Sequence, residues 1–148
     1  MAVTLEEILL APDARPKVAA DCCTLIEQEV SEMSGVSGSA VKLAHKTVTT
    51  FLPGHVRHMV GVMLPEMVDA LEPYWTGFNA SDGFAFGDYL ANRGGEVSQA
   101  LLSVTDARAT ASGRPTVIKA YGAVRRGAAR HVEAALPRVG ELVQKYAP

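Results

Sequence analysis

The feature that most constrains this chain is a set of apolar stripes at three-to-four-residue spacing. One stripe spans 56–71 and keeps a helical phase through Pro65, and another spans 117–146 and keeps its phase through Pro137. Apolar side chains at this spacing form one face of an α-helix. A proline inside a helix removes one hydrogen bond and presses its ring on the preceding turn. We therefore predict two long helices, each kinked at its proline.

Shorter stretches of the same kind predict further helices. Thr4 and Glu7 have the spacing of a capping box, which predicts a short helix that Pro12 closes and that serves as a docking arm over residues 1–12. The segment 73–83 carries no clear pattern and is expected to be weakly structured. The other predicted helices run from Pro16 to Met33, from Ser37 to Phe51, over 84–92 and over 96–112.

The absence of period-two alternation defines the predicted fold class. No segment alternates apolar and polar residues for long enough to indicate a strand. A chain of 148 residues fits one domain, and at this size it can bury roughly 68–70% of its unfolded surface. We predict an all-α fold, a single-domain bundle of about five to seven helices over residues 1–148, two of them kinked at proline.

Several features favour a cytoplasmic location. Glu6 and Glu7 lie where a signal peptide needs positive charge. No stretch reaches the roughly eighteen consecutive apolar residues of a membrane span. Cys22 and Cys23 are adjacent, a spacing that strains a disulfide, so two free thiols in a reducing compartment are the simpler interpretation.

Charge is arranged in four blocks that alternate in sign. Residues 1–33 carry a net −5, residues 34–65 a net +3, residues 66–106 a net −6 and residues 107–148 a net +6, which gives −2 for the whole chain. One interpretation is that oppositely charged helices lie side by side. The other is that the last block binds an anionic partner. Nucleic acid is disfavoured, because the overall balance is slightly acidic and the basic region lacks interleaved aromatic residues.

Aromatic residues are concentrated in one short segment, which holds six of the nine in the chain. Aromatic side chains bury large areas, so this segment plugs the end of the bundle, forms a homo-oligomer interface or lines a ligand pocket. The sequence alone leaves these three interpretations open. The six residues are Tyr74, Trp75, Phe78, Phe84, Phe86 and Tyr89.

No combination of residues predicts a catalytic or metal site. His55 and His58 are spaced for one helix face, but Arg57 places a positive charge between them and a solvated face is the simpler interpretation. His131 and Glu133 have the spacing of the zinc deaminase motif, but its cysteine partner motif is missing. A histidine that is hydrogen-bonded within the bundle is the expected role of His131. We therefore predict no enzymatic activity, no metal and no cofactor.

Four segments carry an ordered set of motifs: 64–74, 86–90, 104–108 and 131–137. Together they resemble a family of small helical cytosolic proteins from actinobacteria. The resemblance extends from about residue 35 to the end of the chain. It implies a bacterial cytosolic helical protein, and it brings no known activity, cofactor or catalytic residue. Asp106 and Arg108 lie two apart in one segment and cannot face each other, so each is expected to cap or bridge to a neighbouring helix.

Two functional hypotheses follow from these observations. The first is a non-enzymatic interaction protein that self-associates as a homo-oligomer, with the aromatic segment and the basic carboxy-terminal helix as contact surfaces. The second is a small-molecule binding protein for an apolar or anionic-headed ligand. In the second, Trp75, Phe84 and Phe86 form the wall of the pocket, and Arg125 or Arg130 lies at its mouth.

Overall fold

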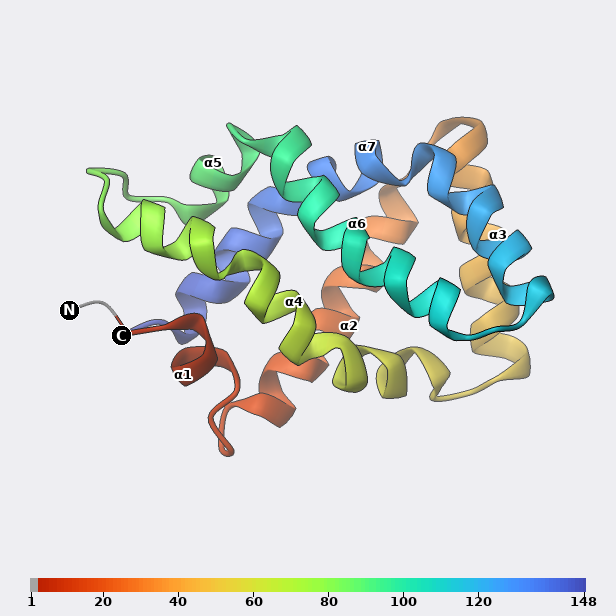
Figure 1. Ribbon diagram of the computed structural model, residues 1–148, viewed down its shortest axis with the longest axis horizontal. Helices are drawn as coiled ribbons and strands as arrows, with labels where there is room; N and C mark the ends of the chain where they lie inside the picture. Colours follow the sequence, from red (N-terminus) through yellow and green to blue (C-terminus); the bar gives the residue numbers. More distant parts are fainter. Residues whose placement is uncertain (1–2) are drawn as a thin grey trace.

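The computed structural model describes residues 3–148, and over this range it contains seven α-helices and no strand (Figure 1). The prediction of an all-α bundle is thus confirmed. Among the described residues, no helix has both the length and the apolarity that crossing a membrane requires. The helices are α1 (Leu5–Leu9), α2 (Arg15–Glu32), α3 (Gly35–Phe51), α4 (His55–Asn79), α5 (Phe86–Ala91), α6 (Gly94–Ala111) and α7 (Pro115–Tyr146).

The short helix α1 lies against α4 (Figure 1). Thr4 caps it by accepting a hydrogen bond from the Glu7 backbone amide, as the capping box predicts. The Leu5 amide donates to both carboxylate oxygens of Glu72 at 3.0 Å, so an acidic side chain of α4 faces the positive end of α1. The Trp75 indole donates to the Val3 carbonyl at 2.8 Å. The first two residues of the predicted docking arm lie outside the described residues.

The helix α4 is longer than the sequence indicates. It continues through Pro65, as predicted, and also through Pro73 as far as Asn79, so the expectation of a weakly structured segment over 73–83 is wrong for its first seven residues. The physical reason is a buried stripe that crosses Pro73 without a break. The buried residues are Leu64, Val68, Leu71, Trp75 and Phe78. Their burial offsets the hydrogen bond that Pro73 removes.

The hydrophobic core lies toward one end of the molecule, where α1, α5, the second half of α4 and the second half of α7 meet (Figure 1). The helix α7 runs unbroken through Pro137, as predicted. Beyond that proline its side chains Leu136 and Val143 are buried against the core. This end of the bundle therefore holds most of the buried apolar side chains.

The opposite end is packed loosely. Residues 111–120, which include the first turns of α7, are all exposed, and Gly38 is the one buried residue of α3. Val117 begins the predicted apolar stripe of α7, yet it is exposed, as is its neighbour Ile118. The prediction that this stripe faces the core is thus wrong at its beginning, because the loosely packed α3 leaves the first turns of α7 largely uncovered.

Candidate functional site

The aromatic segment contributes three rings to the core. Trp75, Phe78 and Phe86 are buried, and the Trp75 and Phe86 ring centroids lie 5.0 Å apart at a near-perpendicular angle. The Gln144 side chain of α7 accepts a hydrogen bond from the Phe86 amide and donates one to the Phe84 carbonyl. Such burial is what a plug at the end of the bundle requires.

The other aromatic residues of the segment behave differently. Tyr74 and Tyr89 are half-buried at the edge of the core, and the Arg93 guanidinium lies 3.7 Å from the centroid of the Tyr89 ring. Phe84 is 95% exposed, in the loop between α4 and α5. The structure therefore does not bring Phe84 together with Trp75 and Phe86 as one pocket wall.

Arg125 takes part in a polar cluster between α6 and α7. Its Nε atom donates to Asp106 at 2.9 Å, and the Tyr121 hydroxyl donates to the same carboxylate oxygen at 2.6 Å. These two hydrogen bonds, that from Arg125 first, hold the pKa of Asp106 below its ordinary value. Arg108 reaches Glu66 on α4 at 2.8 Å. The expectation that Asp106 and Arg108 bridge to neighbouring helices is confirmed.

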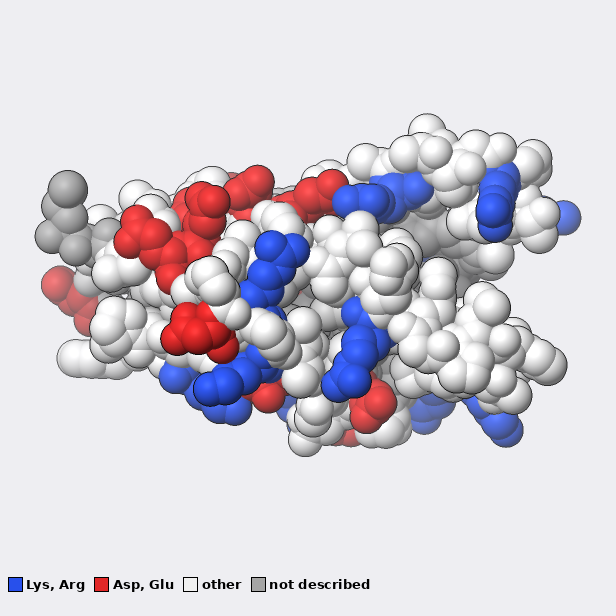
Figure 2. Space-filling model, turned by 90° about the horizontal axis from the view of Figure 1, so that it is seen from below, with Lys and Arg blue, Asp and Glu red and all other residues white. Residues whose placement is uncertain are grey.

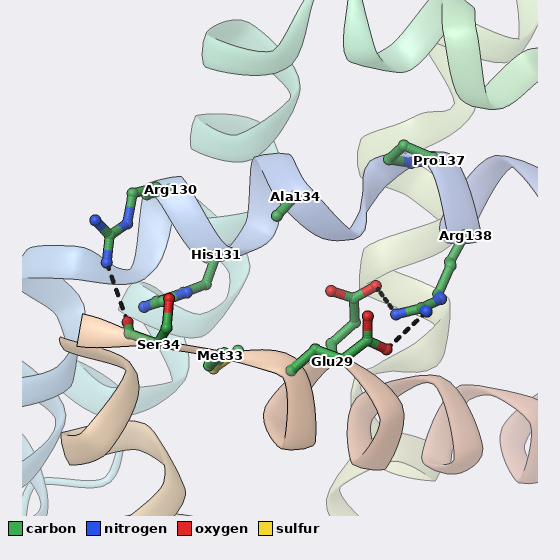
Figure 3. Close-up of a pocket in the computed structure, with 9 residues that line it drawn as sticks. Glu29, Met33, Ser34, Arg130, His131, Ala134, Pro137 and Arg138 are labelled. Carbon is green, nitrogen blue, oxygen red and sulfur yellow. Dashed lines mark hydrogen bonds and ion pairs between the residues drawn. The ribbon is translucent and has the colours of Figure 1, made fainter. Parts of the chain in front are cut away.

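Arg130 lies at a cavity of about 600 Å³ between the end of α2 and the middle of α7 (Figure 3). Its guanidinium donates to the Ser37 hydroxyl at 2.8 Å, and the His131 Nε2 atom lies 2.9 Å from the same hydroxyl. Burial, with Arg130 nearby, lowers the pKa of His131. His131 is thus hydrogen-bonded within the bundle, as predicted.

Three of the four charged side chains around this cavity, Glu29, Glu32 and Arg138, are paired with one another. Arg138 of α7 contacts Glu29 at 2.8 Å and Glu32 at 2.7 Å, and these pairs close one side of the cavity (Figure 3). Trp75, Phe84 and Phe86 do not line it. The predicted combination of an aromatic wall with an arginine at the mouth is therefore not assembled at this cavity.

Cations dominate the end of the molecule that lies opposite the core. The segments 33–65 and 107–132 hold nine lysines and arginines and no aspartate or glutamate. In Figure 2 the right-hand end of the face displays Lys and Arg without Asp or Glu, whereas toward the left acidic side chains gather together with further Lys and Arg. Arg108 and Arg125 are paired with acids, and within residues 3–148 no ion pair involves the other seven. These seven are Lys42, Lys46, Arg57, Arg114, Lys119, Arg126 and Arg130.

The pairing of oppositely charged blocks holds for part of the molecule. The second half of α7 forms ion pairs with α2, through Arg138 with Glu29 and Lys145 with Asp21. The helix α3, however, carries bases and no acids, and its main neighbour is α7, whose first half is also basic and free of acids. Like charges therefore accumulate where α3 and α7 meet, and neutralisation between neighbours does not explain them.

Apolar side chains are exposed at the same end. Phe51 is 77% and Leu52 is 55% exposed at the turn between α3 and α4, and Val117 and Ile118 are exposed in the first turn of α7. The two turns that lead into α4 and α7 lie at one end of the bundle (Figure 1). We call this surface the basic end. Its residues are Phe51, Leu52, Val117 and Ile118 with the cations Lys46, Arg57, Arg114 and Lys119.

Sequence reasoning had predicted the cationic helix but not this surface. The signal that marks the surface is the coincidence of two acid-free segments with an apolar turn, Phe51-Leu52-Pro53-Gly54. Periodicity predicts the helix that ends at Phe51, but a stripe shows only which side of a helix is apolar and not whether another helix covers it. The three-dimensional arrangement supplies that missing fact.

Metal-ligating and nucleophilic side chains are dispersed. Over residues 3–148, His, Cys, Asp and Glu do not converge in any group of three that fits a metal ion. Cys22 and Cys23 are free, half-buried thiols. Burial raises the pKa of the Cys22 thiol to about 11, which disfavours the reactive thiolate.

Comparison with known proteins gave one match. A family model described as a family of unknown function (DUF6918) matches residues 5–147. Neither the curated proteins nor the solved structures contain a match to this chain.

Proposed function

We propose from its geometry that this chain, which belongs to DUF6918, a family of unknown function, is a non-enzymatic helical protein. In this proposal it acts through macromolecular contacts made by its basic end. The observation that carries the proposal is the exposure of Phe51, which is 77% accessible in a turn flanked by cations. Exposed apolar patches rimmed by polar residues are typical of interaction sites.

The electrostatics of the basic end support an anionic partner. Arg57 follows the exposed turn, and Arg114 and Lys119 flank Val117 and Ile118. A surface that carries one sign of charge attracts the opposite sign and raises the rate of association with it. The apolar side chains then supply burial once the partner has arrived. Together they favour a partner surface that offers negative charge and apolar area side by side.

Self-association is the second candidate, and the separation of charge favours one form of it. A two-fold dimer through the basic end would place the cations of one copy opposite those of the other, which is unfavourable. A head-to-tail contact would place the basic end of one copy on the acid-rich surface near α1 and α5 of the next. That contact would be weakened by salt, because it depends on attraction between opposite charges.

The cavity beside Arg130 favours a third candidate, a small-molecule binding protein. Its volume of about 600 Å³ lies within the range of ligand pockets. Three of its four charged side chains, however, are already paired, through the contacts of Arg138 with Glu29 and Glu32. A ligand would have to compete with those ion pairs, so the basic end is the better supported site.

Photo-cross-linking in the cells of the source organism tests the proposed contact surface. A photoreactive phenylalanine analogue is placed at Phe51 in one strain and at Phe84 in another. These two phenylalanines are both exposed but lie at opposite ends of the bundle. We expect light-dependent adducts of the chain from position 51 and few from position 84, because contacts made by the basic end bring a partner within reach of the first probe only.

The nature of the adducts distinguishes the candidates. An adduct with the mass of two chains would identify self-association, and an adduct with another macromolecule or with lipid would identify a different partner. Equal yields from the two positions, or adducts from position 84 alone, would contradict the assignment of the contact surface.

A further inference from the structure

We propose that the partner of the basic end is the surface of an anionic phospholipid bilayer. The protein would dock on it peripherally, with Phe51 and Leu52 inserted among the headgroups. This inference rests on the contact role proposed above and names the partner. It follows from three observations: the chemistry of the apolar turn, the distribution of charge and the placement of a second exposed turn.

The turn between α3 and α4 makes two hydrogen bonds of its own at Leu52. The Leu52 amide donates to the Val48 carbonyl at 2.8 Å, and the Leu52 carbonyl accepts from the His55 amide at 3.0 Å. Pro53 has no amide hydrogen to satisfy. A segment that enters a membrane interface loses hydrogen bonds to water, so internal satisfaction lowers the cost of insertion. At Leu52 these bonds lower the backbone cost of burying the apolar side chain in the interface.

The charge distribution orients the molecule on such a surface. Lys46 precedes the inserting turn and Arg57 follows it, with no acidic residue anywhere in residues 33–65. Each basic side chain held near an anionic leaflet strengthens binding by about fivefold. The acid-rich end, which carries α1 and α5, would face away from the membrane, where repulsion by the leaflet is screened.

A second point of contact lies beside the first. The turn between α6 and α7 is at the same end of the bundle (Figure 1), and Arg114 and Lys119 flank the exposed Val117 and Ile118 there. Helices that bind in a membrane interface carry apolar side chains next to a row of cations. Two such turns at one end match a broad, anionic surface better than a narrow groove on a protein.

Other anionic partners fit the same surface less well. Single-stranded nucleic acid is held by successive stacking aromatics. The two acid-free segments contain two aromatics, Phe51 and Tyr121, and the Tyr121 ring is half-buried with its hydroxyl bound to Asp106. A second copy that is paired two-fold would oppose like charges.

Vesicle flotation with the full chain tests the inference. One set of vesicles is phosphatidylcholine alone, and the other contains about 30% phosphatidylglycerol, both at about 0.1 M salt. We expect the chain to float with the anionic vesicles only and to be released when the salt is raised. The variant Arg114→Glu/Lys119→Glu should bind at least about 30-fold more weakly, because two cations are lost and two anions are gained.

The insertion of the turn is tested separately from the charge. We expect Phe51→Ser/Leu52→Ser to weaken binding at least tenfold, since two apolar side chains no longer leave water. Matched controls are Phe84→Ser at the other end and Lys17→Glu/Arg93→Glu, which changes the net charge equally. Both controls should bind as the unmodified chain does, and circular dichroism should show every variant to be folded.

Three results would overturn the inference: no binding of the unmodified chain to anionic vesicles, equal binding to both vesicle types, or equal loss in the control variants. The experiments distinguish an incorrect partner from an incorrect contact surface. If the chain does not bind vesicles but forms a protein adduct from position 51 in cells, the proposed surface would be supported and the proposed partner would be refuted.

Discussion

Gly87 of α5 and Gly140 of α7 meet backbone to backbone, and this contact fixes α5 against the longest helix. A Cβ atom added at Gly140 would overlap the amide nitrogen and Cα of Gly87. A Cβ added at Gly87 would lie 2.7 Å from the Pro137 carbonyl oxygen. The contact requires glycine on both sides because there is no room for even one methyl group. It places the core residues Phe86 and Leu90 of α5 against α7.

We predict that Gly140→Ala is strongly destabilising, whereas Gly122→Ala in the same helix is not. Overpacking at Gly140 should lower the free energy of unfolding by about 3 kcal/mol. Gly122 has no atom within 4 Å of an added Cβ, so alanine there should raise it by about 0.5–1 kcal/mol. Urea titrations followed by circular dichroism measure both values. A Gly140→Ala variant as stable as the parent would show that α5 does not pack on α7 in this way.

Two of the three phenylalanines in the aromatic segment should respond differently to truncation. Phe86 is fully buried against Trp75 and Phe78, so Phe86→Ala should cost about 3–5 kcal/mol of unfolding free energy. Phe84 is 95% exposed, and Phe84→Ala should change that free energy by less than about 0.5 kcal/mol. Chemical denaturation of both variants provides the measurement. Similar losses in the two would mean that this segment is not a plug.

Tyr146 should ionise well above its ordinary range. Its hydroxyl donates to Asp21, and this hydrogen bond, with burial and the charge of Asp21, raises its pKa to about 12. Because the folded pKa is above the unfolded value, the stability from this pair is complete below about pH 10 and is lost between about pH 10 and 12. An ultraviolet titration of the parent against Tyr146→Phe isolates this phenol.

The Asp21→Asn variant completes that test. Without the carboxylate charge, the pKa of Tyr146 should fall back toward the ordinary value of about 10. Urea midpoints at about pH 9 and about pH 11 should then differ less in the variant than in the parent. A Tyr146 pKa that is unchanged by Asp21→Asn would refute the assignment of Asp21 as its partner.

The residues that sequence reasoning placed correctly are those whose patterns are local. Thr4 caps α1, and α7 continues through Pro137 because its stripe keeps phase beyond the proline. The bridges from Asp106 and Arg108 also followed from helix geometry, since residues two apart cannot face each other. In each case the information lies within a few turns of the chain.

What the sequence did not reveal depends on contacts between distant segments. The extension of α4 through Pro73 depends on burial of Trp75 and Phe78 against other helices. The exposure of Phe51 and Val117 depends on which helices cover α3 and the start of α7. Periodicity identifies an apolar face, but only the packing of the whole chain shows whether that face is covered.

Cation-exchange chromatography tests most directly whether a chain of net charge −2 presents a concentrated cationic surface. At about pH 7 and low salt, we expect the protein to be retained on a sulfonated matrix, because the basic end acts independently of the net charge. The Arg114→Glu/Lys119→Glu variant should elute at much lower salt than Lys17→Glu/Arg93→Glu, although the two carry the same net charge. Elution of both variants at the same salt concentration would contradict the central claim that charge and exposed apolar side chains are concentrated at one end.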